Sequence, residues 1–169
     1  MRAALPDPST SHQGPLYRAL NPIWARDPLS GIGAKRHGGR FNAKGRPALY
    51  TAMTVMGAVA EANQIGRPFE PVTLVSYDAH LTSLFDCTNP AHLVAHDIKA
   101  DDLAADDWRL QMMARGTSTA QDLTETLIAL GYHGLIAPSF AKGRPPNARN
   151  LVLWEWDSLK LIDTEHRLR

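Results

Sequence analysis

The order in which strand-like and helix-like patterns follow one another most restricts how this chain of 169 residues can fold. Five short runs of apolar and β-branched residues are typical of strands. These runs are Leu16–Leu20, Pro47–Ala52, Pro71–Tyr77, Gly134–Pro138 and Leu151–Trp156. They lack the regular helical spacing of a βαβ array and so predict an α+β domain with a mixed or mostly antiparallel sheet. The last run is apolar on both faces, which predicts a central strand.

Helical spacing of apolar residues predicts the connecting helices. Thr54 is a suitable N-cap for a helix through about Gln64, with Gly66-Arg67-Pro68 as its stop. Helices and strands are thus interspersed along the whole chain. Further helices are predicted over 89–95, 100–114 and Thr119–Leu130.

Length and composition favour one domain, because no repeat or low-complexity linker divides a chain long enough to bury a sizeable core. The polar residues 1–13 predict a loose terminal segment and leave 14–169 as the domain. No apolar run approaches the ~20 residues of a membrane span, and the N-terminus lacks the apolar core of a signal peptide. The single cysteine, Cys87, excludes an internal disulfide and predicts a reducing, cytoplasmic location.

Charge is unevenly distributed although the net charge is only +1. Residues 1–70 hold nine Lys or Arg against four Asp or Glu, whereas residues 71–169 hold nine against thirteen. This balance argues against a globally basic nucleic-acid binder. The N-terminal excess is either a local anion-binding face or an ordinary solvated surface.

Glycine and basic residues dominate the segment Ala25–Gly45, which predicts a long functional loop. Residues 30–46 hold five glycines and six Lys, Arg or His side chains. Glycines let the backbone approach a ligand closely, and the planar fork of Arg40 suits a diphosphate. The alternative is that Arg40 pins its own loop to a carboxylate.

Tyr50 lies ten residues after Arg40 and shares a strand face with Ala48 and Ala52. Two alanines leave open space beside the ring, as a stacking platform for a ligand requires. The alternative is a core tyrosine whose hydroxyl is satisfied within the protein.

Glu61 is an isolated acid in an otherwise uncharged helix. Helical side chains lean toward the N-terminus, so Glu61 would lie over Gly57 and Ala58 with little to block a ligand. The alternative is a glutamate on the solvent face of the helix.

Other motifs carry less chemistry. Gly31–Arg36 has neither the glycine spacing of a Walker loop nor the framing of a dinucleotide fingerprint. Aromatic residues do not interleave with the basic run as they do in single-strand nucleic-acid platforms. His92 and His96 are four residues apart, a weak pattern for metal ligands, and we predict no metal.

Several motifs together resemble the RES domain, the toxin of RES–Xre type II toxin–antitoxin modules. The run S-G-x-G-A-x-R-x-G-G-R-F-N-x-x-G, then A-L-Y-T-A and A-V-A-E, carries the spacing of Arg40, Tyr50 and Glu61. G-Y-H-G-L-I-A-P-S and N-L-V-L-W resemble the closing motifs. The resemblance covers about Tyr17 to Trp156, with Phe41 where the family often has tryptophan.

This resemblance implies a fold similar to ADP-ribosyltransferases, with a split β-sheet core, flanking helices and NAD⁺ as substrate without a metal. It implies that Arg40 contacts the phosphates or ribose, that Tyr50 lies against the nicotinamide-ribose end, and that Glu61 acts at the scissile bond. Other residues that it implies for NAD⁺ binding are Tyr17, Arg18, Asn42, Ser139 and Asn150.

The implied reaction is cleavage of the nicotinamide–ribose bond, with ADP-ribose transferred to a protein such as phosphoribosyl pyrophosphate synthetase, to water or to phosphate. A cognate Xre-type antitoxin is expected to occlude the pocket, and DNA would be contacted only through that antitoxin. The residues also leave open a non-enzymatic nucleotide- or RNA-binding module that uses the basic glycine-rich loop.

Overall fold

The structure is a computed structural model that describes residues 4–63 and 70–168. The predicted helix end at Gln64 and stop at Gly66-Arg67-Pro68 lie outside these described residues. In chain order the elements are β1 (Thr10–Leu20), η1 (Pro22–Trp24), α1 (Ile32–His37), β2 (Leu49–Ala52), α2 (Val55–Ala62), β3 (Thr73–Asp86), α3 (Pro90–Ala95), α4 (Ala100–Ala104), α5 (Trp108–Arg115), α6 (Thr119–Ala129), β4 (Gly134–Pro138), β5 (Arg149–Leu153) and β6 (Lys160–Leu161).

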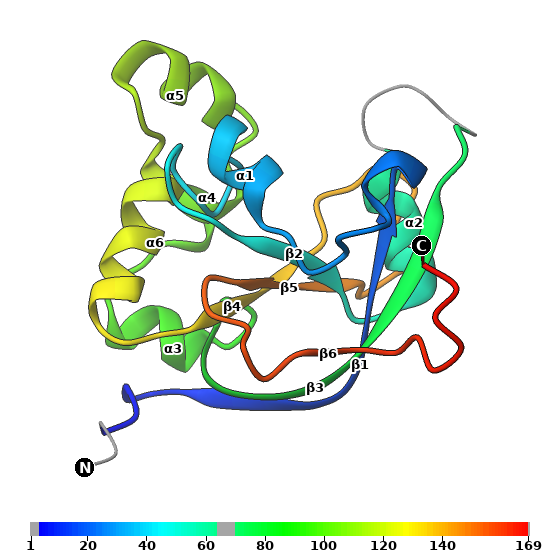
Figure 1. Ribbon diagram of the computed structural model, residues 1–169. Coiled ribbons are helices and arrows are strands. Elements are labelled where there is room, and N and C mark those ends of the chain that lie inside the picture. The colour runs from blue at the N-terminus through cyan, green and yellow to red at the C-terminus, as the bar shows by residue number, and fades with distance from the viewer. Residues whose placement is uncertain (1–3, 64–69, 169) are drawn as a thin grey trace.

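The strands form one sheet in the order β1-β2-β5-β4-β3-β6, and β1 also pairs with β3. Strands β1 to β5 therefore close on themselves as a barrel (Figure 1). Within the described residues only the β3–β4 pair is parallel, so the predicted α+β domain with a mostly antiparallel sheet is confirmed. The implied split of the sheet is not seen, because the pairing of the described strands runs continuously around the ring.

Strand β1 begins at Thr10, so the prediction of a loose segment over residues 1–13 is wrong for Thr10–Gln13. These residues pair with the second half of β3, as far as Leu84. Their polar side chains and the following Gly14-Pro15 are typical of a loop. Their strand conformation depends on a distant partner that a local pattern cannot reveal.

Strand β3 has 14 residues and extends well beyond the predicted run Pro71–Tyr77. Its first part pairs with β1, and its last three residues pair in parallel with β4. The pairing with β1 has a register shift between Leu81 and Leu84, where Ser83 takes the left-handed conformation at φ 58°. This bulge shifts the inward-facing positions by one residue, so that Leu84 continues the interior cluster after Leu81 and Phe85 faces the helices.

Two apolar clusters lie on opposite faces of the barrel wall. The first holds residues from all five barrel strands and fills the interior. The second packs outward residues of β3, β4 and β5 against helices. On β5, Leu151 and Leu153 point inward while Val152 points outward, and β5 lies between β2 and β4. The prediction of a central strand that is apolar on both faces is confirmed, although β5 begins at Arg149.

Helices cover the barrel on two sides. Figure 1 shows α3 to α6 on one side and α2 on the other, and α2 packs on β1 and β2. The predicted helix over 100–114 is divided into α4 and α5 by Ala105–Asp107. A capping box between Ser118 and Gln121 begins α6, which ends close to the prediction. Among the described residues, none of the helices has the length and apolar character that crossing a bilayer requires.

Candidate active site

The basic glycine-rich segment predicted as one long loop contains a short helix, α1, and is fixed to the barrel by two indoles. Trp154 Nε1 donates to the Phe41 carbonyl at 2.9 Å, and Trp156 Nε1 donates to the Leu29 carbonyl at 3.0 Å. Both tryptophans follow β5, so the C-terminal part of the chain holds the segment at two points. The segment is therefore ordered by specific contacts.

Asn42 is fully buried inside this segment. Its Nδ2 donates to the carbonyls of Ala34 and Arg46 at 2.9 Å each, and its Oδ1 accepts from the Tyr50 hydroxyl at 2.7 Å. With no exposed surface, Asn42 cannot touch a ligand in this conformation, contrary to the role that the resemblance implied. It holds Tyr50 in place instead.

The Tyr50 hydroxyl is also engaged within the protein. It accepts from the Phe41 N–H at 3.0 Å, and burial raises the pKa of Tyr50, so the hydroxyl stays protonated at neutral pH. A Cβ on Gly39 would overlap this hydroxyl and would lie 2.6 Å from Asn42 Oδ1, which explains the glycine. The alternative of a satisfied tyrosine hydroxyl is therefore correct, while the ring remains at a cavity surface.

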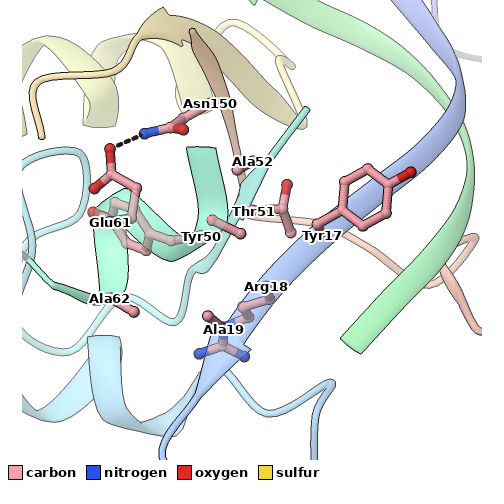
Figure 2. Close-up of a pocket in the computed structure, with 10 residues that line it drawn as sticks. Tyr17, Arg18, Ala19, Tyr50, Thr51, Ala52, Glu61, Ala62 and Asn150 are labelled. Atoms are coloured by element: carbon pink, nitrogen blue, oxygen red, sulfur yellow. Dashed lines mark hydrogen bonds between the residues drawn. The ribbon is translucent and has the colours of Figure 1, made fainter. Parts of the chain in front are cut away.

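Two adjoining cavities, of about 250 and 230 Å³, share Tyr50, Glu61 and Asn150 in their walls. The first cavity also contacts β1 through Arg18, and the second contacts Arg40 in the glycine-rich segment. Figure 2 shows the first cavity, with the Asn150 amide directed at the Glu61 carboxylate. Glu61 therefore stands where the two cavities meet.

The Glu61 carboxylate is held by side chains from two other segments. Its Oε1 accepts from Ser139 Oγ and from Asn150 Nδ2, both at 2.6 Å. Ser139 is almost fully buried just after β4, and Asn150 lies on β5. Bonds to a charged acceptor are short and strong, so they fix the orientation of the carboxylate. Glu61 is half-buried in the cavity wall rather than on the open solvent face.

The Arg40 guanidinium is fixed at the second cavity. Its Nη1 donates to the carbonyls of Ala105 at 2.7 Å and Leu103 at 3.3 Å, and its centre lies 4.3 Å from the Phe140 ring. Burial lowers the pKa of Arg40, while the Asp106 carboxylate, 3.9 Å away, opposes that change. Arg40 thus pins its loop, but mainly to backbone carbonyls rather than to the carboxylate of the alternative. Arg40 also lines the second cavity.

Arg18 and Tyr17 reach the first cavity from β1. Arg18 Nη1 donates to the Pro28 carbonyl at 3.3 Å. Figure 2 shows the Tyr17 ring directed away from Glu61, at the opposite end of the view. Arg18 and Tyr17 thus line the first cavity, and neither of them lines the second.

A family model for the RES domain matches residues 15–168, nearly the whole chain. The chain belongs to the RES domain family. Its fold is similar to a chain in the crystal structure of the M. tuberculosis MbcT-MbcA toxin–antitoxin complex, with a TM-score of 0.68 and 22% identity. That match covers 92% of this chain and 84% of the other. No curated protein sequence matches this chain.

The RES domain thus brings most of the predicted site residues to one place. Arg18, Tyr50, Glu61 and Asn150 surround the first cavity, and Arg40 adjoins them in the second. The prediction missed three residues of the second cavity, because they lie in segments without a recognised motif. Those three residues are Trp108, Arg109 and Phe140.

The histidine pair of the RES domain has structural partners. His92 Nδ1 accepts from the Asp86 N–H at 3.1 Å, and His96 Nε2 bonds to the Tyr132 hydroxyl at 2.8 Å. Both rings pack against Phe85. Within residues 4–63 and 70–168, no group of three or more His, Cys, Asp or Glu has the arrangement of a metal site.

Proposed function

We propose that this RES domain is a toxin that cleaves the bond between nicotinamide and ribose in NAD⁺ and passes ADP-ribose to an acceptor. The observation that carries the proposal is the Glu61 carboxylate, held by Ser139 and Asn150 where two cavities meet. The RES family membership and the resemblance of the motifs to NAD⁺-cleaving toxins support it.

The chemistry needs a fixed negative charge more than it needs a proton donor. When the glycosidic bond breaks, its electron pair leaves with nicotinamide, which departs as a neutral base, and positive charge develops on the ribose. A preorientated carboxylate stabilises that charge without reorganisation during the reaction. In this mechanism Glu61 faces the ribose, and the acceptor oxygen then bonds to the anomeric carbon and loses its proton.

The surrounding residues fit the two ends of the dinucleotide. The Tyr50 ring lies in the wall of both cavities beside Glu61, where it would contact the nicotinamide-ribose end. Arg40 lines the second cavity and offers positive charge to the phosphates. Ser139 would act through Glu61 and Asn42 through Tyr50, so both would position the residues that touch substrate.

The acceptor and the partner complete the proposal. The acceptor is a protein such as phosphoribosyl pyrophosphate synthetase, water or phosphate, and the reaction takes place in the cytoplasm, where NAD⁺ is available. We also propose an Xre-type antitoxin that covers the two cavities. The similarity of the fold to a chain of the MbcT-MbcA toxin–antitoxin complex supports such a partner.

The test is incubation of the purified protein with NAD⁺, with and without phosphate, followed by mass spectrometry of the products. We expect nicotinamide release, and free ADP-ribose, its phosphorylated form or a modified protein identifies the acceptor. Glu61→Gln should lower the release at least about a hundredfold. Glu155→Gln is the matched control, because Glu155 is a surface glutamate, and it should match the wild type.

Retained nicotinamide release by folded Glu61→Gln would refute this assignment of the site. RNA binding that weakens steeply with salt, without any nicotinamide release, would favour the non-enzymatic alternative.

A further inference from the structure

Two arginines line the second cavity, although like charges repel each other. Arg40 comes from the glycine-rich segment and Arg109 from the first turn of α5. Their guanidinium carbons lie 6.0 Å and 4.4 Å, respectively, from the centroid of the same Trp108 ring. The two positive charges therefore gather around one buried indole at the cavity wall.

Two carboxylates, Asp106 and Glu61, lie near this pair. Asp106 lies 3.9 Å from Arg40, but its side chain is fully exposed, and Glu61 is bonded to Ser139 and Asn150. Arg109 has no ion-pair partner among the residues that the structure describes. Burial and the charge of Arg109 lower the pKa of Arg40, whereas the charges of Asp106 and Glu61 raise it. An anion between the two guanidiniums would relieve this repulsion.

The hydrogen bonds of Arg40 limit the donors that it can offer to an anion in the cavity. Its Nη1 is committed to the carbonyls of Leu103 and Ala105, so only part of its donor fork faces the cavity. Arg109 supplies a second fork and is exposed. Its stacking on Trp108 restrains the side chain before a ligand arrives, which lowers the entropic cost of binding.

We propose that Arg109 is a ligand-binding residue and that Arg40 and Arg109 form a subsite for phosphate groups. The guanidinium fork matches the oxygens of a phosphate in a bidentate manner. The inference rests on the proposed function only for the source of that phosphate, which is either the diphosphate of NAD⁺ or inorganic phosphate used as the acceptor. Arg109 contacts no reacting atom in this arrangement, so its effect is on binding.

Calorimetric titration of ADP and of inorganic phosphate tests the subsite directly. Arg109→Gln should weaken ADP binding about tenfold if the diphosphate occupies the subsite, or phosphate binding by the same factor if the acceptor does. Arg109→Lys keeps the charge without the fork and should restore only part of the affinity. Arg115→Gln, on the exposed surface of the same helix, should bind both ligands within about twofold of the wild type.

Steady-state kinetics separate binding from chemistry. If the diphosphate is the ligand, Arg109→Gln should raise KM for NAD⁺ about tenfold and leave kcat within about twofold. The inference is overturned if the wild type binds neither ADP nor phosphate, or if Arg109→Gln binds both as the wild type does.

The outcomes also separate this inference from the proposed function. ADP or phosphate binding that depends on Arg109, in a protein that releases no nicotinamide, would support the subsite and refute NAD⁺ cleavage. Nicotinamide release by a protein whose ADP and phosphate binding does not change in Arg109→Gln would support NAD⁺ cleavage and refute the subsite.

Discussion

The two faces of strands β2 and β5 differ in composition although they belong to the same two strands. On the inner face, Leu49, Leu151 and Leu153 are fully buried among other apolar side chains. On the outer face, Tyr50 and Asn150 belong to a network of hydrogen bonds beside the two cavities. The alternation of a strand therefore separates packing from the candidate chemistry by a single residue.

The difference teaches that the two faces have different requirements. The inner face needs only apolar volume, which neighbouring strands supply in any well-packed barrel. The outer face needs particular partners, because each buried donor or acceptor must be paired. Glu61 depends on Ser139 and Asn150, and Tyr50 depends on Asn42, so side chains from five segments must meet. Substitutions on the two faces should therefore have separable effects.

Leu151→Ala should have the largest effect on stability. Removing this buried side chain leaves a cavity in the barrel and should lower the free energy of unfolding by about 2–5 kcal/mol. Activity per folded molecule should stay near that of the wild type. Denaturant unfolding and nicotinamide release measure the two quantities. Leu110→Ala, at an exposed leucine, should change stability by no more than about 0.5 kcal/mol. A large loss of activity without a loss of stability in Leu151→Ala would break the comparison.

Gly39→Ala should lower both stability and activity, because the added methyl group overlaps the Tyr50 hydroxyl. We expect a loss of about 1–3 kcal/mol in the free energy of unfolding, with slower nicotinamide release from the molecules that remain folded. Gly33→Ala is the matched control, since a Cβ there meets no atom within 4 Å and α1 gains a better helix former. Equal effects of the two substitutions would contradict the close contact.

Ser139→Ala should affect mainly the outer face. It removes one donor to Glu61 Oε1 while Asn150 remains, so kcat should fall about tenfold with a smaller change in KM. Ser158→Ala, at an exposed serine, should leave the kinetics unchanged. Adding Asn150→Ala to Ser139→Ala should give a non-additive loss, because both side chains hold the same oxygen. Strict additivity would argue against joint positioning.

Tyr50→Phe should have the smallest effect, and that effect should depend on pH. Burial raises the pKa of Tyr50 above its ordinary value of about 10, so the folded state favours the protonated hydroxyl. The resulting stability is present below about pH 10 and is lost as the pH rises above that value. The variant should be about 1 kcal/mol less stable at pH 8, and the difference should narrow above pH 10. A difference that widens above pH 10 would contradict a buried, protonated hydroxyl.

Local patterns in the sequence predicted the elements with local causes. Thr54 caps α2 by accepting from the Gly57 N–H, and α6 begins at Thr119, both as predicted. The extra length of β1 and β3 was not predicted, because the first residues of β1 and the last residues of β3 form strands by pairing with each other across the bulge at Ser83. Helix α1 was missed because Gly31 and Gly33 weaken its helical pattern.

The candidate site was predicted in part from its motifs. They indicated Arg40, Tyr50 and Glu61, but a motif does not tell which way each side chain points. Asn42 therefore appeared as a ligand contact although it is buried under Tyr50. Arg109 was missed because its position depends on how α5 packs beside the glycine-rich segment, and no local pattern reports that contact.

The most direct test of this account measures Glu61→Gln and Leu151→Ala side by side, each for nicotinamide release per folded molecule and for the free energy of unfolding. We predict that Glu61→Gln loses at least about a hundredfold in release while its stability changes by roughly 1 kcal/mol or less, and that Leu151→Ala shows the opposite pattern. Nicotinamide release by Glu61→Gln at the wild-type rate would contradict the central claim that this carboxylate acts on the glycosidic bond.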